Sequence, residues 1–192
     1  MCPFSACDWS SSFNSYVPTG LASDLWNPPT TLCSGTRPGL DLASGADYCA
    51  ILPEVTDIKV GGKSSGYNVN KNSFVNLVFN AKIDSQQLPL VMYAVDWGDN
   101  ENTTVSGVEM RDRQSTDNPF SLYHLYDYWD LKAKDASGSS VITCSNDSGG
   151  NYCETTPRVK IRDNWGWCNG GTAINDCDQW TEFGGTVKVY EK

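Results

Sequence analysis

Hydrophobic and polar residues alternate along several short stretches of the chain from residue 55 onward. In residues 74–81 every second residue from Val75 to Ala81 is apolar, and two of the three residues between them are asparagines. Residues 90–97 repeat the alternation, which places Trp97 on the apolar face. A period of two is typical of a β-strand with one buried face. These two stretches therefore predict two strands of a common core.

Shorter stretches of the same kind predict further strands, and clusters of Gly, Asn, Asp and Ser separate them. No stretch of ten or more residues has the pattern of an amphipathic helix. The further strands are predicted at residues 56–60, 121–126, 128–134, 158–162 and 186–190. Short alternating strands separated by turns favour an all-β, Ig-like antiparallel β-sandwich over residues 55–192.

Residues 1–54 lack a sustained periodicity and are rich in Ser, Pro, Gly, Thr and Asn. The segment nevertheless contains four of the eight cysteines and two tryptophans, Trp9 and Trp26, which a flexible linker rarely carries. We expect a disulfide-rich, mostly irregular N-terminal extension that packs on the main domain, because alone it could not bury enough apolar surface.

Eight cysteines, an even number, occur in the chain, and none lies in a C-x-x-C pair of the kind that zinc sites favour. Four disulfides in an oxidising compartment, and hence a secreted protein, are the preferred interpretation. Sequence alone leaves the connectivity open. Loops bounded by neighbouring cysteines favour local pairing: Cys2 with Cys7, Cys33 with Cys49, Cys144 with Cys153, and Cys168 with Cys177.

The formal net charge is −9 and the pI is near 4.4. An acidic surface repels nucleic acid and anionic lipid, so we expect neither as a partner, whereas cations are plausible ligands. No window of eighteen apolar residues occurs, so this segment is not expected to insert into a membrane. The first residues lack the basic and apolar regions of a signal peptide, and we therefore expect a signal or an anchor upstream of residue 1.

One combination of motifs resembles a known family. The strand at residues 90–97 runs into Val-Asp-Trp-Gly-Asp-Asn at residues 95–100, and His-Leu-Tyr follows at residues 124–126. Asp-x-x-Gly occurs at residues 135–138, and again at residues 163–166. The combination resembles the PKD (polycystic-kidney-disease) domain, in which a strand ends in a Trp-Gly-Asp turn, H-x-Y follows, and a further strand closes on D-x-x-G. The resemblance covers roughly residues 55–192. It implies a PKD-like sandwich that serves extracellular proteins as a spacer, a mechanical element or a contact surface.

The residue types in the motif have understandable structural roles. Trp97 would fill the core between the sheets, and Gly98 permits a backbone path that a Cβ would obstruct. The two aspartates can accept backbone N–H bonds in the turn, and the histidine and tyrosine can pack beside it. Asn100, which replaces the usual glycine, tolerates a positive φ. The motif residues are Asp96, Trp97, Gly98, Asp99, His124 and Tyr126.

Oxygen-rich loops raise the possibility of a calcium site, since calcium takes six to eight oxygen ligands. No EF-hand spacing occurs, and capping of the turns by their own side chains is the preferred interpretation. No other cofactor is expected. The candidate ligands are Asp96, Asp99, Asn100, Glu101 and Asp163.

Catalysis is not predicted. His124 is the single histidine, and it occupies the H-x-Y position, where a structural role is expected. Four C-terminal tryptophans are expected in the core, with an exposed sugar-stacking platform as the alternative; they are Trp129, Trp165, Trp167 and Trp180.

We therefore expect a non-enzymatic structural or adhesive module on the cell surface, with protein or glycan ligands. One alternative is the exposed head of a pilus or filament subunit that contacts copies of itself. The other is a carbohydrate-binding accessory domain of a secreted hydrolase.

Overall fold

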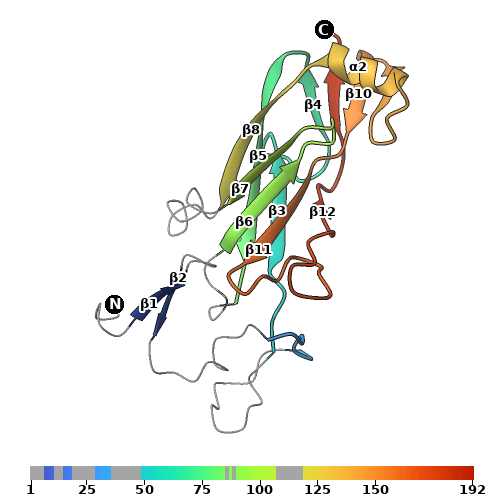
Figure 1. Cartoon of the computed structure of the whole chain (residues 1–192). Coiled ribbons are helices and arrows are strands. Elements are labelled where there is room, and N and C mark those ends of the chain that lie inside the picture. Colours follow the sequence, from blue (N-terminus) through green and yellow to red (C-terminus); the bar gives the residue numbers. More distant parts are fainter. Residues whose placement is uncertain are drawn as a thin grey trace.

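The structure of the protein is a computed structural model that describes residues 7–10, 15–18, 29–35, 49–84, 87, 90–106 and 119–192. Strands predominate in these residues, and the one described helix is short (Figure 1). The elements are β1 (Cys7–Ser10), β2 (Ser15–Pro18), β3 (Glu54–Val60), β4 (Tyr67–Asn70), β5 (Ser73–Lys82), β6 (Leu90–Asp96), β7 (Asn102–Ser106), β8 (Phe120–Tyr126), α2 (Tyr128–Ala136), β9 (Thr143–Asp147), β10 (Gly150–Thr155), β11 (Arg158–Asp163), β12 (Thr181–Glu182) and β13 (Val187–Tyr190).

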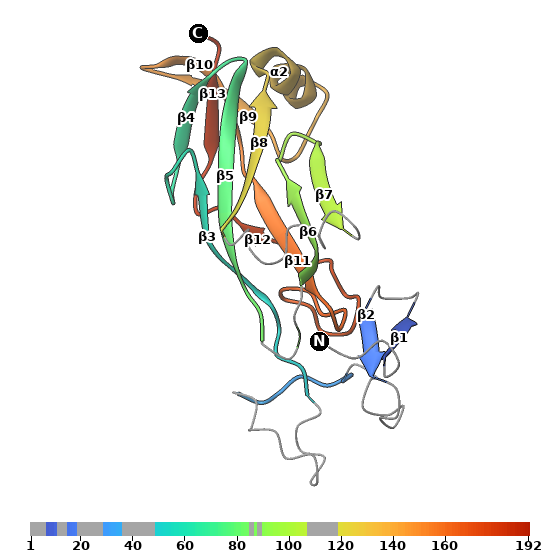
Figure 2. The ribbon, with the colours of Figure 1, turned by 90° about the vertical axis from the view of Figure 1, so that its left-hand side faces the viewer.

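Strands β3 to β13 form a sandwich of two layers (Figures 1 and 2). One layer is the three-stranded sheet β3-β5-β8. The other layer holds two four-stranded sheets, of order β12-β11-β6-β7 and β4-β13-β10-β9. The pairings are antiparallel except for that of β13 with β4, which is parallel. The predicted all-β fold is confirmed, with this one parallel pair as a departure.

The two four-stranded sheets are linked along the chain, because β10 leads into β11 and β12 leads into β13. Thr156 and Pro157 separate β10 from β11, and proline cannot donate a backbone hydrogen bond to a ladder. The interruption is local, since Phe183 N donates to Pro157 O at 2.9 Å between the two paired regions. The second layer therefore consists of two sheets joined by the short connections after β10 and β12.

The core lies between the layers and is built from the alternating faces that the sequence predicts. Phe79 of β5 stacks on Phe120 of β8, with ring centroids 5.1 Å apart. Tyr93 of β6 packs against both rings from the opposite layer, at 5.7 and 5.2 Å. Trp97 is 1% exposed, as predicted. Burying such rings supplies much of the stabilisation of a domain of this size.

The strand predicted at residues 128–134 is wrong, because this segment is the helix α2. Asp127 caps the helix by accepting a hydrogen bond from Trp129 N at 2.8 Å. Tyr128 and Leu131, three residues apart, form its buried side. An i,i+4 ion pair of 2.5 Å joins Asp130 to Lys134. An N-terminal Asp cap with this spacing stabilises a helix and does not support a strand.

The Asp-x-x-Gly at residues 135–138 likewise does not close a strand; it ends α2. Gly138 adopts φ +90° and its N–H donates to Asp135 O at 2.9 Å. A glycine in this conformation commonly terminates a helix. Cys144 and Cys153 lie opposite each other in the hairpin formed by β9 and β10.

Part of the N-terminal segment contacts the sandwich. Trp167 Nε1 donates to Pro29 O at 3.0 Å. The Gln87 side chain pairs with the backbone of Ile51, accepting from its N–H at 2.7 Å and donating to its carbonyl at 2.9 Å. Further upstream, β1 and β2 form an antiparallel hairpin that the sequence did not predict.

Three of the four predicted disulfides are present: Cys33–Cys49, Cys144–Cys153 and Cys168–Cys177. The predicted pairing of Cys2 with Cys7 lies outside the described residues, because Cys2 and the side chain of Cys7 are not among them. The disulfides indicate an oxidising environment. Among the described helical residues, none forms a helix long and apolar enough to span a bilayer.

Candidate functional site

The turn after β6 is organised by its own aspartates, as the motif predicts. Asp96 Oδ1 accepts from Gly98 N at 2.8 Å, and Asp99 Oδ1 accepts from Glu101 N at 3.0 Å. Asn100 adopts φ +67°, the conformation expected of it. Such side-chain bonds two residues along the chain stabilise a tight turn. Both aspartates therefore act first as caps of this turn.

Gly98 lets the turn approach β10 closely. Its φ is +75°, and a Cβ at this position would collide with the Thr155 side chain and the Thr156 backbone. Thr155 Oγ1 instead donates to Gly98 O at 2.5 Å. Any larger residue would have to displace β10 and would be strained by the positive φ.

His124 reaches this turn from β8, across the interior of the sandwich. Its ring stacks on Trp97 with centroids 4.6 Å apart and planes 10° apart, and meets Tyr126 edge-on at 4.6 Å. His124 Nε2 lies 2.6 Å from Asp99 Oδ2, and both side chains are buried. The histidine and the aspartate thereby tie the edge strand of one layer to a turn of the other.

Two further hydrogen bonds hold Trp97 in the same cluster. Tyr126 Oη donates to Trp97 O at 2.8 Å, and Trp97 Nε1 donates to Thr103 Oγ1 at 3.1 Å. Burial, followed by the charges of Asp99 and Asp96, raises the pKa of Tyr126 well above its usual value. The phenol therefore stays protonated and remains a donor throughout the physiological range.

Helix α2 closes the cluster with Lys134. Its Nζ donates to the backbone carbonyl of Asp99 at 2.5 Å and pairs with Asp130. Burial lowers the pKa of Lys134, but the hydrogen bond to Asp130 and the charges of Asp130, Asp99 and Glu101 together raise it above its ordinary value. The sequence motif did not point to Lys134, since 35 residues separate it from Asp99.

The five candidate calcium ligands do not form one site. Asp96 is paired with Arg158, whose guanidinium Nη2 lies 2.8 Å from its carboxylate. Asp163 lies at the far end of β11 from Arg158, and the register places it opposite Leu90 of β6. Five residues of strand separate the two positions by roughly 16 Å. Ligands at opposite ends of β11 cannot share an ion.

The group that does converge is Asp99, Glu101 and His124, whose ligand atoms all lie within 4.8 Å of one another. An imidazole with two carboxylates suits zinc or another transition metal better than calcium, which takes oxygen ligands. Both oxygens of Asp99 already have partners, and the ammonium of Lys134 adds a positive charge beside them. The Asp99 carboxylate is therefore already hydrogen-bonded and compensated in charge by side chains of the protein itself.

The second Asp-x-x-Gly turn forms a separate polar centre at the other end of β11. Asp163 Oδ1 accepts from Trp165 N and Trp167 N, both at 2.9 Å, and Oδ2 accepts from Gln87 Nε2. Burial raises the pKa of Asp163 to about 6, against the lowering effect of these hydrogen bonds. Since Gln87 also binds Ile51, Asp163 anchors the contact with the N-terminal segment.

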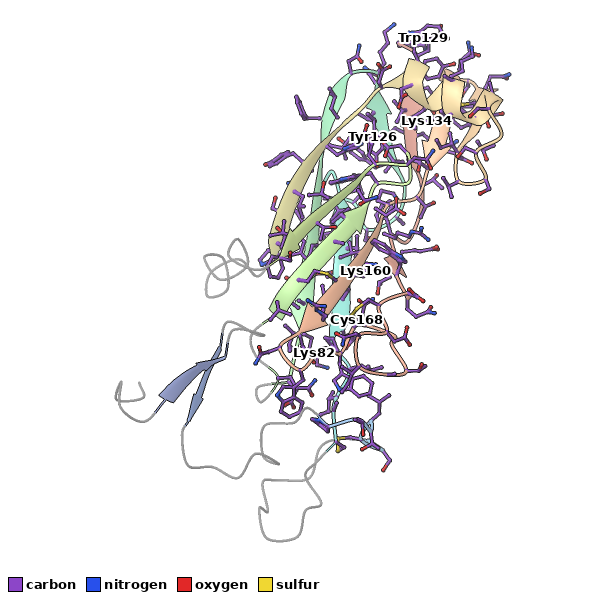
Figure 3. All side chains as sticks on the ribbon, viewed as in Figure 1. Lys82, Tyr126, Trp129, Lys134, Lys160 and Cys168 are labelled. Atoms are coloured by element: carbon purple, nitrogen blue, oxygen red, sulfur yellow. A yellow bond between two sulfur atoms is a disulfide. The ribbon has the colours of Figure 1, made fainter. Side chains whose placement is uncertain are left out.

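The tryptophans expected in the core differ in their surroundings. Trp167 is fully buried, as expected. Trp129 is 51% exposed, which contradicts the expectation. Trp165 and Trp180 are partly buried, and Trp180 lies beneath Lys160, with the ammonium 4.3 Å from its ring centroid. Figure 3 shows Trp129 on α2, distant from Lys160 on β11.

Comparison with known proteins adds no assignment. No family model, no curated protein and no solved structure matches the chain.

Proposed function

We propose that the protein is a non-enzymatic module of the extracellular surface, with a structural or adhesive role. The proposal rests on the structural role of the only histidine in the chain, His124. His124 is buried between Trp97 and Tyr126, and its Nε2 is engaged by Asp99. A general base must reach a substrate proton within hydrogen-bond distance. This imidazole joins two layers of the fold instead.

The arrangement of the disulfides supports a secreted location. Each of the three closes a loop of at most sixteen residues, and two of them are in the C-terminal half of the sandwich. Such cross-links persist where thiols are oxidised, outside the cytosol. Each also stabilises the folded protein by about 2–3 kcal/mol in the chain-entropy account, because it shortens the loop that the unfolded chain can open.

The PKD-type assignment belongs to the same proposal. In favour of it, two of the three elements of the motif, the Trp-Gly-Asp turn and H-x-Y, meet in space: Trp97 contacts both His124 and Tyr126, and Asp99 contacts His124. Residues separated by 25 or more positions converge here as the resemblance implies. A PKD-like module would act through its outer surface, since its internal polar groups hold the sandwich together.

Labelling of intact source cells with an antibody against the full chain tests the location. We expect signal on unpermeabilised cells and its loss after treatment with an external protease. An antibody to a cytosolic protein serves as the control and should label only permeabilised cells. Signal restricted to permeabilised cells would contradict the proposal, and signal along filaments would assign the module to a filament subunit.

A further inference from the structure

The outer face of the β3-β5-β8 sheet exposes three large apolar side chains. Phe74 of β5 is 72% exposed, and Tyr123 and Leu125 of β8 are 69% and 44% exposed. We call these three residues the aromatic face. The opposite side of the same strands is fully packed, with Val75 and Leu77 at 1% and 0% exposure. The core therefore does not account for the apolar residues on the outside.

The strand register makes the aromatic face continuous. Phe74 lies directly opposite Leu125, and Asn76 lies directly opposite Tyr123. Phe74 and Tyr123 are thus diagonal neighbours, about 7–8 Å apart at their Cα atoms. Two exposed rings beside a leucine on a pleated surface form a shallow apolar strip of about the length of a short oligosaccharide.

Neutral hydrogen-bonding groups border this strip. Ser121 Oγ donates to Asn76 Oδ1 at 2.8 Å, and the two side chains extend the row on the same outward side. The outward-facing residues from Phe74 to Val78 and from Ser121 to Leu125 carry no formal charge. Charged residues border the strip at its two ends: Lys59, which is paired with Asp57, lies opposite Val78, and Asp127 follows β8 two residues beyond Leu125. On a chain of net charge −9, this is a neutral surface.

We propose that the aromatic face binds a neutral polysaccharide. The Phe74 and Tyr123 rings offer flat apolar surfaces to the C–H faces of sugar rings, and Leu125, opposite Phe74 and two residues from Tyr123, adds an apolar surface beside them. The Tyr123 hydroxyl, the Asn76 amide and the Ser121 hydroxyl are suited to the sugar hydroxyls, because each can donate and accept. The inference rests on the proposed extracellular adhesive role, since it names the ligand of that surface.

Charge and area favour a glycan over a second copy of the chain. Self-association would bring two surfaces of net charge −9 together through a patch that contains no cation. An aromatic side chain buries about 150–250 Å² when fully covered. The three partly exposed side chains thus offer roughly 350 Å², whereas a stable protein interface needs about 800 Å² from each partner. The absence of cations in the strip also disfavours an acidic polysaccharide.

Affinity electrophoresis of the full chain in native gels tests the proposal. The gels contain hydroxyethyl cellulose, xylan, galactomannan or glycol chitin as neutral polymers, and polygalacturonate as the acidic comparator. We expect retardation by at least one neutral polymer and none by polygalacturonate. The double variant Phe74→Ala/Tyr123→Ala should weaken that retardation at least tenfold in apparent Kd. Tyr123→Phe, which keeps the ring, should retain most of it.

Trp129→Ala is the matched control, since it removes an exposed aromatic ring from α2 and leaves the sheet face intact. It should bind as the unchanged chain does. Thermal melts of all variants verify that the fold is retained.

Three results would overturn the inference: equal retardation of the unchanged chain and the double variant, retardation only by polygalacturonate, or no retardation by any polymer. A dimer in sedimentation that the double variant abolishes would also overturn it, by assigning the face to self-association. None of these outcomes affects the cell-surface labelling, which tests the proposed function separately.

Discussion

His124 and Asp99 meet between the two layers of the sandwich, with Nε2 of the imidazole 2.6 Å from Oδ2 of the carboxylate. β8 supplies the histidine and the turn after β6 supplies the aspartate, so the contact connects strands that share no backbone hydrogen bonds. Its removal therefore affects the packing of the layers and not only one turn.

We expect His124→Ala to lower the free energy of unfolding by about 3–5 kcal/mol, because Asp99 is left buried without its partner. Urea unfolding measures the loss. Asp99→Ala and the double variant complete a cycle in which the double loss should be smaller than the sum of the single losses. Lys59→Ala, which removes only an exposed ion pair with Asp57, is the control and should cost little. A loss below about 1 kcal/mol for His124→Ala would show that the contact is dispensable.

Two tryptophans provide a matched comparison of burial. Trp97→Ala is expected to cost about 3–5 kcal/mol, since the ring is 1% exposed and donates to Thr103. Trp129→Ala should change stability by less than about 1 kcal/mol, because half of the ring faces solvent. Equal melting temperatures for the two variants would contradict the packing of the core.

The strands with clear alternation were predictable from the sequence. β5 and β8 each present one apolar face to the core, and their period of two is visible without any structure, whereas β6 is apolar up to Val95 and buries Leu90 and Ala94 as well as Tyr93 and Val95. The three disulfides in the structure were also predictable, since each pair bounds one short loop.

Helix α2 was missed because nine residues are too few for a helical period to stand out, although the Asp127 cap, the i,i+4 spacing of Asp130 and Lys134, and Gly138 at its end are local helix signals. The short strands β4 and β7 were missed because a run of four or five residues is too brief for a period to stand out.

The partners in the polar clusters could not be read from the sequence. Lys134, Thr155 and Gln87 lie 35, 57 and 76 residues from the groups that they bind. No periodicity links such positions, and only the folded topology brings them together. The different exposure of Trp129 and Trp167 has the same origin, since the side that each ring faces is decided by tertiary packing.

Calcium provides a test of whether the acidic turn after β6 does more than cap itself. We expect no change in melting temperature when calcium is added at moderate ionic strength, because both oxygens of Asp99 are already engaged. A bound ion would stabilise the native state by mass action, by about 2.7 kcal/mol at a hundred times its Kd. A rise in melting temperature with calcium but not with magnesium, abolished by Asp99→Ala, would establish a calcium site against this expectation.

Asp163 should make stability depend on pH in a definite direction. Its pKa in the folded protein is about 6, against 3.8 for an unperturbed aspartate, because burial disfavours the charged form. A raised carboxyl pKa means that the native state binds the proton more tightly than the unfolded chain. The resulting stabilisation is complete below about pH 4 and is lost as the pH rises through about 6. The total change is up to about 3 kcal/mol.

The variant Asp163→Asn isolates this effect, because an amide does not titrate. Its own amide group must face Gln87 Nε2, which adds a cost that does not vary with pH. Asp147 and Asp176, whose pKa values are lowered by hydrogen bonds to backbone N–H groups, add stability as the pH rises, but they do so equally in both chains. Urea unfolding at pH 4, 5, 6 and 7 should therefore show the unchanged chain losing stability relative to the variant between pH 4 and pH 6. A difference between the two chains that stays constant over this range would mean that Asp163 is ionised in the native state throughout.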